Sequence, residues 1–105
     1  MNDPVVARIL SNLPDVRMLQ SDKVPERMKP FVSEWNKLKE EDSDRIILVK
    51  IGKFYEVYAA DAMIFHVNFK APLMNGQLPN TAIPEKSLMK YTALLAEKTF
   101  TWSTL

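Results

Sequence analysis

Residues 46–62, which read IILVKIGKFYEVYAADA, decide the fold. The stretch opens with four aliphatic residues, IILV, and such an unbroken apolar run is typical of a strand that is covered on both faces. Gly52 then breaks the run, and residues 54–58 resume as a second strand or as a bulged continuation of the first. The stretch therefore predicts buried strands near the middle of the chain.

Apolar residues recur at helical spacing on both sides of this stretch. From about residue 26 to residue 40 they lie three or four positions apart, which predicts one apolar stripe along a helix. A second helix is predicted after Pro84, and Phe100 and Trp102 alternate as a last short strand. These patterns predict an α/β fold, a small mixed β-sheet flanked by helices. The two stripes consist of Met28, Phe31, Trp35 and Leu38, and of Leu88, Tyr91 and Leu95.

Three further elements are predicted from local patterns. Met63 to Phe69 alternates as a third strand, Asn75-Gly76 is a hairpin-turn signal, and Asp3-Pro4 can begin a short helix. Because residues 11–25 carry two prolines among scattered polar residues, we expect an extended arm there. The predicted domain organisation is an N-terminal arm over 1–25 and one domain over 26–105.

Composition excludes several function classes. The chain has 105 residues, enough for one domain, and a net charge of +1, which does not indicate a strongly basic nucleic-acid binder. It contains no cysteine and a single histidine, His66, so we expect no metal site, no catalytic triad and no enzyme activity. Its two glycines cannot form a phosphate-binding loop, so no cofactor is predicted.

Membrane insertion is not predicted either. No apolar run approaches the ~18 residues of a membrane-spanning helix. The opening residues MNDPVVARIL carry an acid and a proline where a secretory signal would be basic.

Phe54, Glu56 and Tyr58 occupy every second position of the central stretch. If it is a strand, they share one face, and Tyr55 and Val57 take the other. With the second face toward the core, the first would face outward and offer an aromatic ring beside a carboxylate. A nucleobase, which has a flat face and a polar edge, suits such a surface. The alternative is that Phe54 faces the core and Glu56 lies at a strand edge.

Residues 52–62, GKFYEVYAADA, resemble the GKFYELY or GDFYELF motif of the mismatch-recognition domain of MutS-type DNA repair proteins. The similarity extends upstream through MKPFVSEWNKLKEEDSDRIILVKIG and downstream through MNGQ and AIPEKSLMKYTALLAEKTF. It covers roughly residues 28–105. The motif is most similar to that of the eukaryotic MutS homologue subunit that contacts the mismatch.

The resemblance implies a role for each residue of the motif. Phe54 would stack beside the mispaired base from the minor groove, and Glu56 would hydrogen-bond the displaced base. Lys53 would lie by the DNA backbone. Ile51 and the loop at 79–82, including Thr81, would line the groove. The implied partner is double-stranded DNA with a mismatch, bound weakly by this domain alone because family members also grip DNA with a clamp.

The chain departs from the family pattern at two glycines. Ala82 stands where the family has the glycine of its G-[IF]-P turn, and Thr99 stands where a glycine usually follows the helix. The family's connector, lever, clamp and ATPase domains have no counterpart in these residues. The alternative function is therefore an orphan module of the same fold, serving as an interaction or structural subunit of a larger protein or ribonucleoprotein complex. Other MutS-type domains are further candidate partners. The expected compartment is the nucleus, with the mitochondrion as the alternative.

Overall fold

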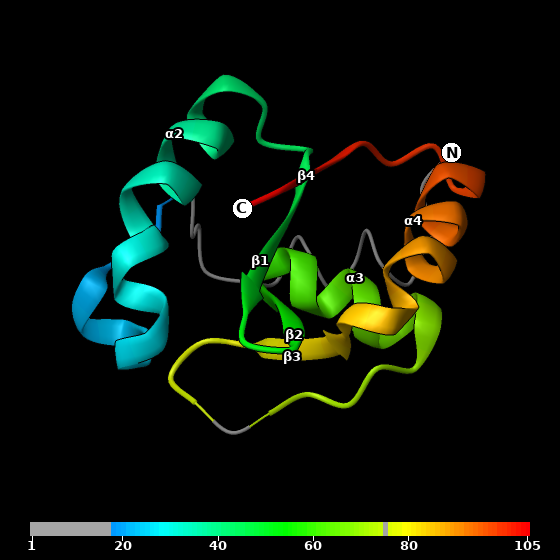
Figure 1. Cartoon of the computed structure of the whole chain (residues 1–105). Coiled ribbons are helices and arrows are strands. Elements are labelled where there is room, and N and C mark those ends of the chain that lie inside the picture. The colour runs from blue at the N-terminus through cyan, green and yellow to red at the C-terminus, as the bar shows by residue number, and fades with distance from the viewer. Residues whose placement is uncertain (1–17, 75) are drawn as a thin grey trace.

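A computed structural model describes residues 18–74 and 76–105 of the chain and shows one mixed β-sheet (Figure 1). Its strands lie in the order β3-β2-β1-β4. β1 and β2 are antiparallel, β2 and β3 are antiparallel, and β4 runs parallel to β1. The predicted small mixed sheet is confirmed, as is the short last strand. The strands are β1 (Ile46–Ile51), β2 (Phe54–Tyr58), β3 (Asn80–Pro84) and β4 (Trp102–Thr104).

Helices flank the sheet, as predicted. The α-helices of the described residues are α2 (Val32–Glu41), α3 (Ala60–Phe69) and α4 (Leu88–Glu97). The short 3-10 turns are η1 (Ser21–Lys23), η2 (Glu26–Phe31) and η3 (Glu85–Ser87). The first predicted helix thus begins as η2, which contains Pro30, and becomes α-helical only after it. Proline has no backbone N–H to donate, so it is tolerated at such a beginning.

The two faces of β1 contribute to two separate cores. Ile46 and Leu48 pack in a cluster with side chains of α3 and α4, whereas Ile47 and Val49 pack in a cluster with η2 and α2. All four side chains are fully buried. Figure 1 shows α2 on one side of the strands and α4 on the other. The predicted burial of this run on both faces is therefore confirmed.

The predicted strand from Met63 to Phe69 is wrong, because these residues form α3. An apolar residue at every second position also places residues four apart on one helix face. Phe65 and Phe69 use that spacing, with ring centroids 5.4 Å apart, and Tyr91 of α4 packs against both. The sequence pattern is compatible with either element, and tertiary packing stabilises the helix.

Other predictions fall partly outside the described residues. The Asp3-Pro4 helix and Asn75 of the predicted hairpin turn lie outside the described residues. On either side of the predicted turn, Met74 and Asn80 pair in an antiparallel bridge. The described end of the predicted arm, residues 18–25, packs on the domain. Leu19 is buried there, and its backbone N–H and C=O both bond the side-chain amide of Asn36 in α2, at 2.7 and 3.1 Å.

A buried ion pair joins α2, α3 and β1. Lys39 Nζ lies 2.8 Å from Asp61 Oδ1 and donates to the carbonyl oxygen of Arg45 at 2.6 Å. The second oxygen of Asp61 accepts the backbone N–H of Ile47 at 3.0 Å. Burial raises the pKa of Asp61, and the neighbouring ammonium of Lys39 opposes that rise. Because each charge is compensated by the other, loss of either partner would leave a buried charge alone.

Thr99, which follows α4, has a φ of +64°. A β-branched side chain is strained in this left-handed region, whereas glycine adopts it freely. The position at which the family places a glycine is therefore one where the backbone favours glycine.

We expect Thr99→Gly to stabilise the fold by about 1 kcal/mol, the left-handed strain less the chain entropy that glycine adds to the unfolded state. Urea unfolding of both proteins measures the change. Thr101→Gly, at a position that does not have a positive φ, is the matched control and should not stabilise. A Thr99→Gly protein less stable than the parent would contradict this account of the turn.

Candidate nucleic-acid interface at the β1–β2 hairpin

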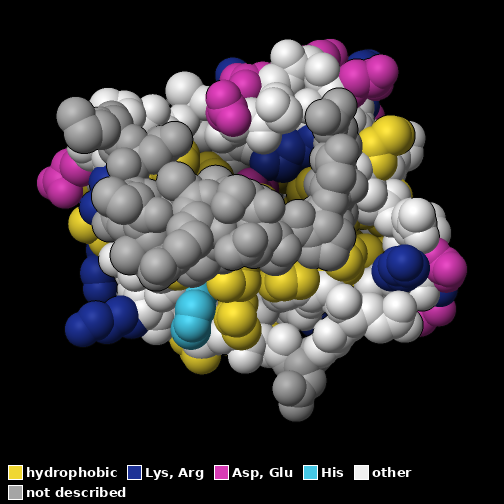
Figure 2. Space-filling view, turned by 180° about the vertical axis from the view of Figure 1, so that it is seen from behind, with side chains coloured by type: hydrophobic (Ala, Val, Ile, Leu, Met, Phe, Trp, Pro, Cys, Tyr) yellow, Lys and Arg dark blue, Asp and Glu magenta, His cyan; other side chains and the backbone are white. Residues whose placement is uncertain are grey.

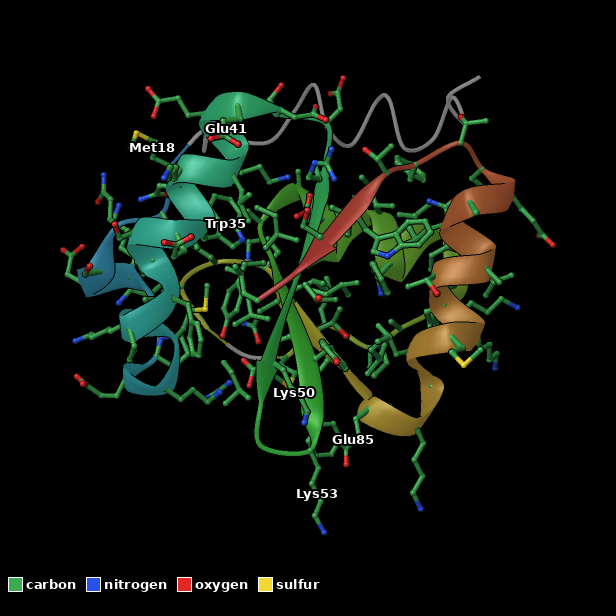
Figure 3. The ribbon with its side chains drawn as sticks, turned by 45° about the horizontal axis from the view of Figure 1, so that its top comes forward. Met18, Trp35, Glu41, Lys50, Lys53 and Glu85 are labelled. Atoms are coloured by element: carbon green, nitrogen blue, oxygen red, sulfur yellow. The ribbon has the colours of Figure 1, made fainter. Side chains whose placement is uncertain are left out.

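The candidate site lies where β1 turns into β2. Ile51 pairs with Phe54 across a two-residue turn made of Gly52 and Lys53. Gly52 has a φ of +63°, which a tight hairpin turn requires and glycine supplies without strain. The second strand is therefore a hairpin partner and not a bulged continuation of the first. In Figure 3 the side chain of Lys53 extends from the tip of this hairpin, away from the body of the domain.

Phe54 is the first residue of β2 and is 49% exposed. Its cross-strand neighbours are Ile51 on one side and Pro84 on the other. Tyr55 and Val57 pack on the opposite face of the strand, in the cluster with α3 and α4. The expectation that Phe54 lies at the surface and not in the core is confirmed. Its ring can therefore receive a flat ligand without unfolding of the domain.

Two lysines near Phe54 differ in their electrostatic surroundings. Lys53 makes no ion pair with any residue of the described part of the chain. Lys50 Nζ lies 3.2 Å from Glu85 Oε2, and both side chains are substantially exposed (Figure 3). Such a surface pair is weak. Within residues 18–74 and 76–105, Lys53 therefore presents a charge at the tip without an acidic partner, whereas the charge of Lys50 is shared with Glu85.

Glu56 and Tyr58 share the face of Phe54 but are buried, so the expectation that they point outward is wrong. Glu56 is 5% exposed and Tyr58 1%. The cluster formed by η2 and α2 covers this face of the sheet, and Tyr58 belongs to that cluster. Only the end of the strand at Phe54 extends to the surface.

Both carboxylate oxygens of Glu56 have a partner. Oε1 accepts the Tyr58 hydroxyl at 2.5 Å, and Oε2 accepts Arg27 Nε at 2.7 Å. The hydrogen bond to Glu56 raises the pKa of Arg27, and burial together with that same carboxylate raises the pKa of Tyr58. The side chain of Glu56 is thus held between the phenol of Tyr58 and the guanidinium of Arg27.

Sequence patterns did not indicate Arg27. It precedes the helical stripe, and no spacing rule connects it to Glu56, which lies 29 positions later. Only the docking of η2 against β2 brings the two together. A buried acid predicted on a strand demands a basic partner somewhere in the fold, but the sequence does not say which one.

The remaining predicted groove residues are placed differently. Ile51 is half-buried against the α2 cluster, next to Phe54. Residues 80–84 form β3, so the expectation of a loop at 79–82 is wrong over most of its length. Thr81 is fully buried there, and its hydroxyl donates to the carbonyl oxygen of Pro72 at 2.6 Å. Thr81 therefore stabilises the fold from inside and does not lie beside Phe54 at the surface.

The described residues hold no group of three or more His, Cys, Asp or Glu side chains that could bind a metal ion. His66 Nδ1 lies 2.8 Å from the carbonyl oxygen of Ala71, a contact that supports the end of α3. No helix of residues 18–74 and 76–105 is long and apolar enough to cross a membrane.

The sequence model of the family described as MutS domain I matches residues 29–101 of the chain. The chain belongs to this family. A probable DNA mismatch repair protein Msh6 of Drosophila melanogaster is 32% identical over 81 residues, which are 73% of this chain and 7% of that protein. DNA mismatch repair protein Msh6 of Homo sapiens is 32% identical over 69 residues, 66% of this chain and 5% of the relative. DNA mismatch repair protein MutS of Chlamydia trachomatis is 31% identical over 75 residues, 70% of this chain and 9% of the relative.

The resemblance to MutS-type proteins is thereby confirmed. This MutS domain I spans less than a tenth of the length of these relatives. The matched range contains the hairpin, Phe54 and Glu56, but it begins after Arg27. Arg27, the counter-ion of Glu56, thus lies outside the range that the family's sequence model matches.

Tyr58→Phe should destabilise this MutS domain I by about 1–3 kcal/mol, because it leaves Glu56 Oε1 buried without a donor. Urea unfolding at neutral pH measures the loss. Tyr55→Phe is the matched control, since the Tyr55 hydroxyl bonds no described residue. A loss no larger than that of the control would contradict the hydrogen bond.

The same variant should also respond differently to alkali. Because the folded pKa of Tyr58 lies above its ordinary value of 10.0, the stability due to the protonated phenol is complete below pH 10.0 and is lost as pH rises further. The parent protein should therefore lose more stability above that pH than Tyr58→Phe does.

Proposed function

We propose that the chain is a DNA-binding domain of mismatch-recognition type, without catalytic residues, in which Phe54 stacks beside a mispaired base. The observation that carries the proposal is the 49% exposure of Phe54 at the tip of a hairpin inside the MutS domain I match. Lys53 is adjacent and exposed. The proposed partner is double-stranded DNA that contains a mismatch.

A half-exposed ring can discriminate mismatches by physical means. Insertion of a side chain between base steps costs unstacking energy, and that cost is smallest where pairing is already defective. Stacking of a base on an aromatic ring returns about 1–3 kcal/mol whatever the base. The stacking energy is therefore similar at matched and mismatched sites. The lower unstacking cost at a mismatch provides the preference for mismatched DNA.

Glu56 is the proposed second contact, through a hydrogen bond from the edge of the displaced base. Both of its oxygens are already accepting, from Tyr58 and from Arg27. A base can therefore bond this carboxylate only in exchange for one of these donors. Arg27 is the exposed one of the two, with 44% of its side chain accessible.

Charge contributes little to this binding mode. The net charge is +1, and Figure 2 shows acidic as well as basic side chains on the face it presents. Few phosphate contacts give low affinity, so we propose that the domain binds DNA weakly alone and with the help of other MutS-type domains. A nuclear location, with the mitochondrion as alternative, stays a prediction.

The second candidate function is an interaction module of a larger protein or ribonucleoprotein complex. The near-neutral charge favours it, because a half-exposed phenylalanine also suits an apolar pocket of a protein. Salt separates the two functions. Binding that includes even a few phosphate contacts weakens measurably as salt rises, whereas apolar docking does not.

Phe54→Ala should abolish the preference for mismatched over matched duplex and change the free energy of unfolding by less than about 1 kcal/mol, where a buried phenylalanine would cost ~3–5 kcal/mol. Fluorescence anisotropy at low salt measures the preference. Met89→Ala, at an 84% exposed position of α4, is the matched control and should leave it intact. An unchanged preference in Phe54→Ala, or none in the parent chain, would remove the mismatch function and favour the interaction module.

Lys53→Met should weaken the binding of matched and mismatched duplex equally. If Lys53 contacts one phosphate, the slope of log affinity against log salt should fall in magnitude by about 0.9. Lys98→Met, an exposed lysine at the end of α4, is the charge-matched control and should leave the slope unchanged. An identical slope in the Lys53 variant would show that the hairpin tip does not touch the DNA backbone.

A further inference from the structure

We propose that Arg27 is a displaceable counter-ion of Glu56 that sets how well the domain distinguishes mismatched from matched DNA. The inference rests on the function proposed above and names a specificity-determining residue for it. Arg27 lies in η2, two residues before the family match begins, and reaches Glu56 of β2 across the sheet face.

The two partners of Glu56 are unequal. Tyr58 is 1% exposed and belongs to the core, so its hydroxyl is a fixed inner donor. Arg27 is the outer donor, since its side chain is 44% exposed and that of Glu56 only 7%. The guanidinium therefore stands between the carboxylate and solvent. Its Nε is the atom that bonds the carboxylate, at 2.7 Å.

This geometry makes Arg27 the partner that a ligand can replace. A half-exposed ion pair contributes little net stability, because solvent competes for both charges. Displacement of the Tyr58 hydroxyl would instead require a change in the core. A base edge that approaches along the hairpin from Phe54 would thus exchange with Arg27 and leave the Tyr58 bond in place.

The exchange also determines what happens at matched DNA. While Arg27 is paired with Glu56, the carboxylate is neutralised and does not repel phosphates. In a matched duplex the donors of the bases are engaged with their partners, so no group replaces Arg27. At a mismatch a displaced base offers a free N–H to Glu56, and Arg27 must then give up its bond to that carboxylate. Arg27 therefore opposes base contact until a mismatch supplies its replacement.

Arg27→Met tests this inference, because methionine keeps an aliphatic stem but removes the charge and the donor. We expect the affinity for matched duplex to fall, because the carboxylate is then unneutralised. We expect the ratio of mismatched to matched affinity to rise about two- to fivefold, the range that corresponds to a half-exposed ion pair. Lys29→Met, on the same 3-10 turn and 39% exposed, is the charge-matched control and should leave the ratio unchanged.

A double-mutant cycle with Glu56→Gln isolates the pair. In the Glu56→Gln background, Arg27→Met should no longer change the ratio, because no carboxylate remains to be released. The NMR signal of Arg27 Nε–H provides an independent readout, and it should shift on addition of mismatched duplex but not of matched duplex. Arg27→Gln serves in the same cycle if Arg27→Met does not fold.

The possible results are distinct. A Phe54-dependent preference in the parent chain, with a ratio that Arg27→Met leaves unchanged or lowers, overturns this inference and leaves the proposed function standing. A change of the ratio that persists in the Glu56→Gln background also overturns it, since Arg27 would then act without Glu56. A parent chain with no preference for mismatched duplex overturns both.

Discussion

The burial of β1 on both faces is the constraint on which the rest of the structure depends. Its four aliphatic residues, Ile46 to Val49, have no exposed surface, so each face of the sheet requires a cover. α3 and α4 supply one cover and η2 with α2 the other. Neither cover encloses the tip of the hairpin, where Ile51 is only partly buried. The tip, with Lys53 and Phe54, is exposed because the strands extend beyond the helices that bury their middle.

Because the helices cover only part of this face of β2, the exposure of its residues falls along the strand. Phe54 lies past the cover, Glu56 lies just beneath it, and Tyr58 lies fully inside. An aromatic ring at the exposed end can meet a ligand with no change in the fold. A carboxylate two residues further in must be compensated, and Tyr58 and Arg27 provide that compensation. Contact with Phe54 therefore needs no rearrangement, whereas contact with Glu56 requires an exchange of partners.

The domain's electrostatics fit recognition by shape more than by charge. The net charge is +1. Of the two lysines near Phe54, Lys50 pairs with Glu85, and Lys53 has no acidic partner among the described residues. A domain of this kind gains little from the phosphates that every duplex offers equally. Under the proposed function, the cost of inserting the ring and the availability of a base edge would distinguish one DNA site from another.

The sequence by itself determined the elements whose signals are local. The IILV run specified a strand buried on both faces, the two apolar stripes specified α2 and α4, and alternation along β2 placed Phe54 opposite Val57 and at the surface. Such signals succeed because the periodicity of a strand or a helix is written in neighbouring residues. The motif around Phe54 was likewise sufficient to indicate the family.

Only the tertiary structure decided the features that depend on distant partners. The pattern of apolar residues in α3 is compatible with a strand as well as a helix. The packing of Phe65 and Phe69 against Tyr91 of α4 favours the helix. Glu56 and Thr81 were expected at the surface, and both are buried because η2 and the Pro72 segment pack over them. The pairing of Arg27 with Glu56 could not be read from a sequence in which 29 positions separate them, since burial of a polar group is set by what the folded chain places above it.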